Sequence, residues 1–153
     1  MALDRRSFIE KTGLIALAWT AGLISPRMLA AANIEEAFVE KPVDDLIALL
    51  AENMTVQPST EIELKIPDVA ENGALVPVTI TSTLDKVGAV AIIAEKNRIP
   101  LIARFSLDEA AEPFVQARVK LADSGEVIVL VSADDQIYST KRFVQVTVGG
   151  CGS

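Results

Sequence analysis

The sequence predicts an all-β fold in which two sheets pack face to face. From residue 61 onward, apolar residues recur at every second position, which is the period of a half-buried strand. Turn-forming residues separate these runs at the spacing typical of a sandwich. Half of the 153 residues are apolar and 23% are charged, which suits one globular domain. The turns are Asn72-Gly73, Lys96-Asn97, Asp123-Ser124-Gly125 and Asp134-Asp135.

The segment from residue 34 to residue 53 is predicted to be helical. Its apolar residues follow the three- and four-residue spacing of one helix face. Pro42 fits only if a second helical segment begins there, with acidic residues in its first turn. The apolar positions are Val43, Leu46, Ile47, Leu50 and Met54.

Seven segments are predicted to be strands. Pro77 cannot donate a ladder hydrogen bond, so its strand is expected at an edge or to be interrupted there. Residues 125–133 form a continuous apolar run, which predicts a central strand. Together the segments predict an immunoglobulin-like β-sandwich of about seven strands, with an N-terminal helical segment and a flexible C-terminal tail. They comprise residues 61–66, 74–83, 87–95, 99–107, 112–121, 125–133 and 136–148.

Residues 1–32 have the pattern of a twin-arginine export signal. Arg5, Arg6 and Phe8 form its core, and a short apolar run and three alanines follow. The run of about eleven apolar residues is too short to span a bilayer. We therefore expect export to the periplasm, cleavage after Ala32 and no membrane span after processing. The mature chain then comprises a helix-plus-sandwich domain, residues 33–148, and a cysteine-bearing arm, residues 149–153.

The composition excludes several classes of function. The formal charge is -7; residues 1–32 contain four Lys/Arg and two Asp/Glu, so the mature chain carries 10 basic and 19 acidic residues and a charge of -9. This balance argues against nucleic-acid binding. The chain has no histidine, which excludes a serine triad, and its one cysteine excludes an internal disulfide or a cysteine-rich zinc site. We predict no metal, no cofactor and no catalytic residue.

Three of the pairs of adjacent acidic residues are interpreted as helix starts or turns rather than as catalytic pairs. Two arginines, Arg104 and Arg118, lie in apolar strands. We interpret them as solvated or ion-paired residues of a strand face, with partner docking as the alternative. The acidic pairs are Glu35-Glu36, Asp44-Asp45 and Asp134-Asp135.

The C-terminal tail carries the candidate site. Cys151 stands between glycines, with Gly149 and Gly150 before it and Gly152 after it. A glycine-rich chain behaves as a flexible tether, and the residues after Val148 extend up to roughly 17 Å at about 3.4 Å each. Such an arm suits a covalent substrate carrier, whose thiol holds a cargo and offers it to successive enzymes.

The thiol has no activating group close to it in the sequence. Lys141 and Arg142 lie ten and nine residues before Cys151, whereas the terminal carboxylate is two residues after it. That carboxylate disfavours the thiolate, which is the reactive form. We therefore expect a thiol of modest reactivity that is activated inside the sites of partner enzymes.

The chain resembles the SoxY family. The resemblance rests on the signal, the helix, the segments IPDVAENGALVPVTI and PLIARFSL, and the terminal Gly-Gly-Cys-Gly. It implies a carrier of sulfur intermediates in periplasmic thiosulfate oxidation, with Cys151 as the attachment site and Gly149, Gly150 and Gly152 in the swinging arm. The family tail usually ends Gly-Cys-Gly-Gly, whereas this chain ends in Ser153, which is also small and flexible.

The resemblance also implies partners. A SoxZ subunit would form a heterodimer with this chain, and a c-type cytochrome enzyme would join thiosulfate oxidatively to the thiol. A hydrolase would then release sulfate, and in some organisms a sulfane dehydrogenase oxidises the remaining sulfur. The chain itself would not be an enzyme.

Two other functions are compatible with a single exposed cysteine. The first is a structural module in which Cys151 forms an intermolecular disulfide with a second copy, an assembly that exposed edge strands would suit. The second is a redox enzyme that uses Cys151. We favour the redox enzyme least, because the chain contains no resolving cysteine and no base.

Overall fold

The computed structural model describes residues 34–52, 54–108 and 110–147. The predicted export signal and the predicted arm therefore lie outside the described residues. The chain divides into two units, residues 1–36 and 37–153. The sheets and their packing belong to the second unit.

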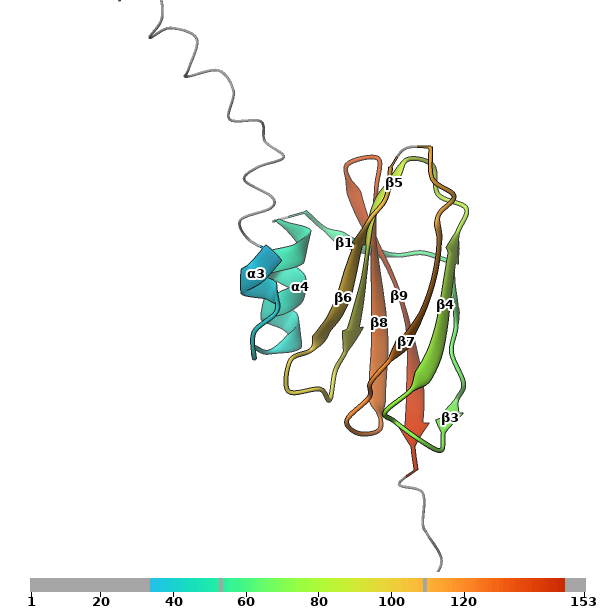
Figure 1. Ribbon diagram of the computed structural model, residues 1–153. Helices are drawn as coiled ribbons and strands as arrows, with labels where there is room; N and C mark the ends of the chain where they lie inside the picture. The colour runs from blue at the N-terminus through green and yellow to red at the C-terminus, as the bar shows by residue number, and fades with distance from the viewer. Residues whose placement is uncertain (1–33, 53, 109, 148–153) are drawn as a thin grey trace, which may run out of the picture. The chain divides into compact units, whose positions relative to one another are not determined.

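Two sheets form the second unit (Figure 1). The larger sheet has the order β1-β9-β8-β5-β6, and β3 pairs with β9 on the same side as β1. The smaller sheet has the order β2-β4-β7. The strands of the larger sheet are β1 (Val56–Pro58), β3 (Val69–Ala70), β5 (Val87–Ala94), β6 (Leu101–Ser106), β8 (Gly125–Ala133) and β9 (Gln136–Val146). Those of the smaller sheet are β2 (Ile62–Lys65), β4 (Val76–Ser82) and β7 (Phe114–Val119).

The facing sides of the two sheets form the main hydrophobic core. Alternation along each strand sends every second side chain inward, as in β4, where Val76, Val78 and Ile80 are buried. They pack in one cluster with residues of the larger sheet such as Val90 and Val129. Each such side chain contributes about 1.5–3 kcal/mol relative to exposure in water. The predicted β-sandwich is therefore confirmed.

A helix covers the other face of the larger sheet. In α4 (Val43–Ala51) the buried Leu46 packs in a second cluster with Ile93, Leu130 and Ile137 (Figure 1). Strand β8 is consequently buried on both faces and lies between β9 and β5. Burial on both faces explains its continuous apolar run and confirms the predicted central strand.

The predicted helical segment consists of two helices, as the proline within it indicates. The short helix α3 (Ile34–Ala37) ends before Pro42, and α4 begins directly after that proline. Proline is suited to this place because it lacks the N–H that a helix start leaves unpaired. Glu52 ends α4 in a left-handed conformation with φ 50°, and its N–H donates to the Leu49 carbonyl.

The expectation of an edge strand at Pro77 is wrong, because β4 is the middle strand of its sheet. The alternative, an interruption, fits the register better. The pairing of β4 with β2 ends at Lys65 and Thr79, so at Pro77 only the β7 ladder continues, with Arg118 opposite. Proline is tolerated because one of the two neighbouring ladders has already stopped.

Candidate functional site

The predicted site residues lie outside the described part of the chain. These are Cys151 with Gly149, Gly150 and Gly152, and the export residues Arg5, Arg6 and Phe8. The structure does describe the point from which the arm departs. Strand β9 ends at Val146, and Thr147 is the last described residue, four positions before Cys151.

One edge of the β9 end is held by β3. Val69 and Ala70 pair in parallel with Gln145 and Val146. The Gln145 N–H donates to the Asp68 carbonyl at 2.8 Å. The Thr147 N–H donates to the Ala70 carbonyl at 2.9 Å, so this ladder continues to the last described residue.

The other edge is held by a serine hydroxyl. The β8–β9 ladder ends at the pair Gly125 and Val144. Beyond it, Ser124 Oγ accepts a hydrogen bond from the Val146 N–H at 2.9 Å and donates one to the Val146 carbonyl at 3.3 Å. Ser124 is part-buried in the turn between β7 and β8. In Figure 1 this turn, β3 and the end of β9 lie together at the bottom of the sandwich.

A third contact comes from the turn that contains Gly73. The Leu121 N–H donates to the Gly73 carbonyl at 2.7 Å. A Cβ at Gly73 would lie 2.4 Å from the Leu121 carbonyl oxygen and 2.9 Å from Cγ1 of Val146. Real Cβ atoms do not approach so closely, so only glycine fits here. The Asn72-Gly73 turn that the sequence singled out therefore packs against Val146. Val146 belongs to the segment from Gln145 to Thr147, which we call the base of the arm.

The two cations nearest to Cys151 in the sequence are already paired. Lys141 lies 2.9 Å from Glu126, and Arg142 lies 2.9 Å from Asp68. These pairs are exposed, so each contributes little to stability. The paired carboxylates nevertheless neutralise part of the positive charge of Lys141 and Arg142.

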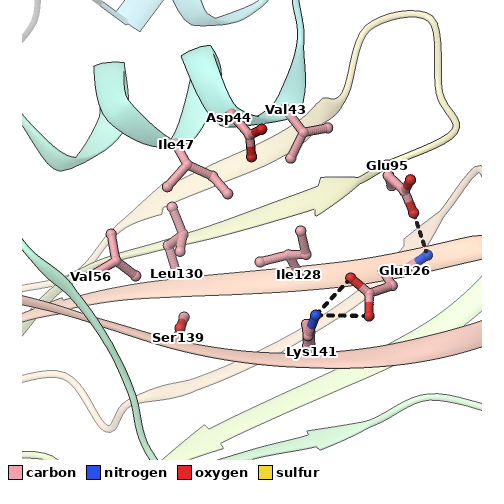
Figure 2. A pocket seen from close by; sticks show the side chains of 10 residues that line it. All are labelled: Val43, Asp44, Ile47, Val56, Glu95, Glu126, Ile128, Leu130, Ser139 and Lys141. Atoms are coloured by element: carbon pink, nitrogen blue, oxygen red, sulfur yellow. Dashed lines mark hydrogen bonds and ion pairs between the residues drawn. The ribbon is translucent and has the colours of Figure 1, made fainter.

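A groove of about 560 Å³ runs between α4 and strands β8 and β9 (Figure 2). Two contacts link its charged groups: Lys141 pairs with Glu126, and the Glu126 N–H donates to Glu95 Oε2 at 3.3 Å. The lining residues are Val43, Asp44, Ile47, Val56, Glu95, Glu126, Ile128, Leu130, Ser139 and Lys141.

Glu95 has a lowered pKa, chiefly because its side chain accepts a hydrogen bond from Lys96 at 2.7 Å. The backbone hydrogen bond from Glu126 lowers the pKa further. The pKa of Lys96 is raised for the same reason, since Glu95 stabilises its charged form.

The acidic pairs occupy the places that the sequence predicts. Two pairs lie in helices, Glu35 and Glu36 in α3, and Asp44 and Asp45 in the first turn of α4. The third pair forms the two-residue turn between β8 and β9, with φ 49° at Asp134 and 59° at Asp135. Arg118 is exposed on β7, and Arg104 is half-buried on β6.

Within the described residues, no group of three or more histidine, cysteine, aspartate or glutamate side chains is placed to hold a metal ion. No helix in the same residues is long and apolar enough to cross a membrane.

The fold is that of an immunoglobulin-like β-sandwich. In the sequence, a single cysteine, Cys151, follows the last strand by five residues. The chain belongs to the SoxY family: the family model described as sulfur oxidation protein SoxY matches residues 47–151. That match includes Cys151.

Among solved structures, the chain is similar to the sulfur carrier protein SoxY from Chlorobium limicola f thiosulfatophilum. The two are 34% identical over 70% of this chain and 97% of that chain, with a TM-score of 0.64. A superoxide reductase (neelaredoxin) from Ignicoccus hospitalis is 13% identical over 56% of this chain and 79% of that chain, with a TM-score of 0.49. A search of curated protein sequences found no match.

Proposed function

We propose that this chain is a periplasmic covalent carrier of sulfur intermediates in thiosulfate oxidation, with the cargo on the Cys151 thiol. One observation carries the proposal: the SoxY family match extends through Cys151. The 34% identity to a structure described as a sulfur carrier protein supports the same role. Family membership also implies partners from the Sox system in general.

The proposed chemistry has two steps. In the first, the Cys151 thiol and thiosulfate form a sulfur–sulfur bond. The thiol proton goes to solvent, and the two electrons pass one at a time to a c-type cytochrome enzyme. In the second, a hydrolase adds water across the bond between the outer sulfane sulfur and the sulfonate sulfur. This step releases hydrogen sulfate and leaves Cys151 as a persulfide. Where a sulfane dehydrogenase exists, it oxidises that remaining sulfur.

In this proposal the chain supplies position and the partners supply activation. Lys141 and Arg142 are each paired with a carboxylate, so part of their positive charge is already neutralised. A thiol that reacts only slowly outside a partner's site is an advantage in an oxidising compartment, where free cysteines form disulfides. The carrier is therefore not an enzyme, and it needs no cofactor of its own.

We further propose that the mature chain works in the periplasm as a heterodimer with a SoxZ-like subunit. The Arg5-Arg6 signal supports export by the twin-arginine route, which carries folded proteins. Export of a folded protein suits a chain that acquires its partner before crossing the membrane.

The Cys151→Ser variant tests the proposal. In a reconstituted system with the partner enzymes, thiosulfate-dependent electron release should fall to the rate measured without any carrier, because serine cannot form the sulfur–sulfur bond. The control is Ser153→Ala, which alters the same tail but keeps the thiol and should retain turnover. Turnover by Cys151→Ser at the wild-type rate would contradict the carrier function.

The same preparations separate the carrier from the disulfide-linked module. Non-reducing mass measurement of the wild-type protein should give the single-chain mass with sulfur-containing adducts. A mass of twice the chain that collapses on reduction, without adducts, would instead support the linked dimer.

A further inference from the structure

We propose that Ser124 is a positioning residue that fixes the end of β9, from which the chain continues to Cys151. This inference rests on the proposed carrier function, because it concerns the arm that holds Cys151. It assigns a role to a residue that has no place in the chemistry of the thiol itself.

On the β8 side, Val146 has no strand residue opposite it. Continuing the register from the pair Gly125 and Val144 would place residue 123 opposite Val146. In that position a strand residue would accept from the Val146 N–H and donate to its carbonyl. The chain has already turned away from β9 there, because Asp123 and Ser124 belong to the turn before β8.

The Ser124 hydroxyl takes the place of that missing strand residue. Ser124 Oγ makes both missing bonds, one as acceptor at 2.9 Å and one as donor at 3.3 Å. Serine can do so because a hydroxyl is at once a donor and an acceptor. Its side chain therefore replaces one strand residue and extends the ladder of β9 by one further pair.

On its opposite edge, β9 is paired with β3. There the Thr147 N–H bonds to Ala70, so this ladder reaches one residue beyond Val146. Without Ser124, the last two residues of β9 would be held by β3 alone. A β-strand paired on one edge, at the end of a sheet, opens more readily than one paired on both.

A fixed base determines the reach of the thiol. Cys151 lies four residues after Thr147, a span of about 14 Å when extended. If β9 also detaches from β3, so that the chain is free from Gln145 onward, Cys151 lies seven residues after the last fixed residue, Val144, a span of about 24 Å. Because effective concentration falls as roughly the three-halves power of tether length, the longer arm lowers it by about twofold.

Three variants test this role. Ser124→Ala removes both hydrogen bonds, whereas Ser124→Thr keeps the hydroxyl. The matched control is Ser82→Ala: Ser82 Oγ accepts from the Leu84 N–H at 3.1 Å and is also part-buried, but it lies in β4. In Ser124→Ala, hydrogen exchange at the Val146 amide should be about five- to tenfold faster. It should stay at the wild-type rate in Ser124→Thr and Ser82→Ala.

A second readout follows the arm directly. With one spin label on Cys151 and a second on an introduced Glu61→Cys, the interlabel distance distribution should broaden in Ser124→Ala only. In the reconstituted system, kcat/KM of the receiving enzyme should fall by roughly twofold. The reaction of Cys151 with a small disulfide reagent should be unchanged, and Ser124→Thr should restore kcat/KM.

Unchanged exchange and an unchanged distance distribution in Ser124→Ala would overturn the proposal. A broadened distribution with wild-type kcat/KM would also overturn it, since the base would then not position the thiol. Failure of the carrier function is distinguishable, because it would appear as turnover by Cys151→Ser. In that case, hydrogen exchange at the Val146 amide would still show whether the Ser124 hydroxyl holds the end of β9.

Discussion

Gly73 lies where two other segments leave no room for a side chain. The Leu121 carbonyl oxygen and Cγ1 of Val146 occupy the space that a Cβ would need. The packing of the base of the arm therefore depends on the absence of one carbon atom. Asn72 Oδ1, which accepts from the Ala74 N–H at 2.9 Å, helps to hold this turn in place.

Gly73→Ala should therefore destabilise the sandwich. We expect the free energy of unfolding to fall by about 1–3 kcal/mol, because the added methyl group forces the backbone of Leu121 or the side chain of Val146 to move. Urea denaturation measures the change.

The matched control for that substitution is Gly88→Ala in β5, where nothing lies within 4 Å of the added Cβ. Alanine there should be neutral or stabilising by up to about 1 kcal/mol, since it reduces the freedom of the unfolded chain. Equal losses of stability at Gly73 and Gly88 would show that the close contact at Gly73 has no effect of its own.

The residues at the base of the arm show what the sequence could not predict. The thiol and its glycines stand out in the sequence because Cys151 is the only cysteine. The sequence places Ser124 and Gly73 in turns but assigns them no further role, because serine and glycine are the ordinary residues of turns. Their roles depend on Val146, which is 22 residues from Ser124 in the chain.

The turn between β5 and β6 connects several elements at the same end of the sandwich. Asn97 Nδ2 donates to the Lys120 carbonyl, and Asn97 Oδ1 accepts from the Ala122 N–H, both at 2.8 Å. Glu95 adds bonds to Lys96 and to the Glu126 N–H. This turn therefore ties β5 to the segment that carries Ser124.

The lowered pKa of Glu95 gives this connection a pH dependence. Because the folded pKa lies below the ordinary value of 4.5, the contribution to stability is present above pH 4.5 and is lost as the pH falls through the folded pKa. The urea midpoints of the wild type and Glu95→Gln should therefore differ most near neutral pH and converge in acid. Because the group is exposed, the difference should also shrink with added salt.

The control for this titration is Glu61→Gln, which removes an exposed glutamate that has no ion pair among the described residues. Its midpoint should follow the wild type across the same pH range. A constant difference between the wild type and Glu95→Gln from neutral to acidic pH would contradict the role of the Glu95 charge.

At the scale of elements, all seven segments predicted to be strands contain one. Alternation of apolar residues predicted β2, β4 and β7, and the continuous apolar run of β8 predicted its central place. The two short strands β1 and β3 were not predicted. Strands of three and two residues show no period, and both exist because β9 offers its edge to them. The expectation that β4 lies at a sheet edge was wrong. A proline requires only that no ladder hydrogen bond is needed at its own position, and at Pro77 the β2 ladder has already ended.

At the scale of the molecule, the larger sheet packs on the smaller sheet with one face and on α4 with the other. This arrangement places the β7–β8 turn, β3 and the end of β9 at one end of the sandwich (Figure 1). The proposed carrier function requires a rigid domain of this kind, because a thiol on a short arm would reach only partners that bind near its base. Residues 33–153 carry 10 basic and 19 acidic residues, and this acidic balance favours partners with basic docking faces.

The central claim is that sulfur travels bound to Cys151, and the most direct measurement is the mass of the C-terminal peptide. The wild-type protein would be incubated with thiosulfate and the oxidising partner enzyme, then digested without reductant and analysed by mass spectrometry. We predict a peptide whose mass has increased by one covalently bound thiosulfate, with the modification at Cys151 and its loss on reduction. An unmodified Cys151 peptide, isolated while thiosulfate oxidation proceeds and depends on this chain, would contradict the account.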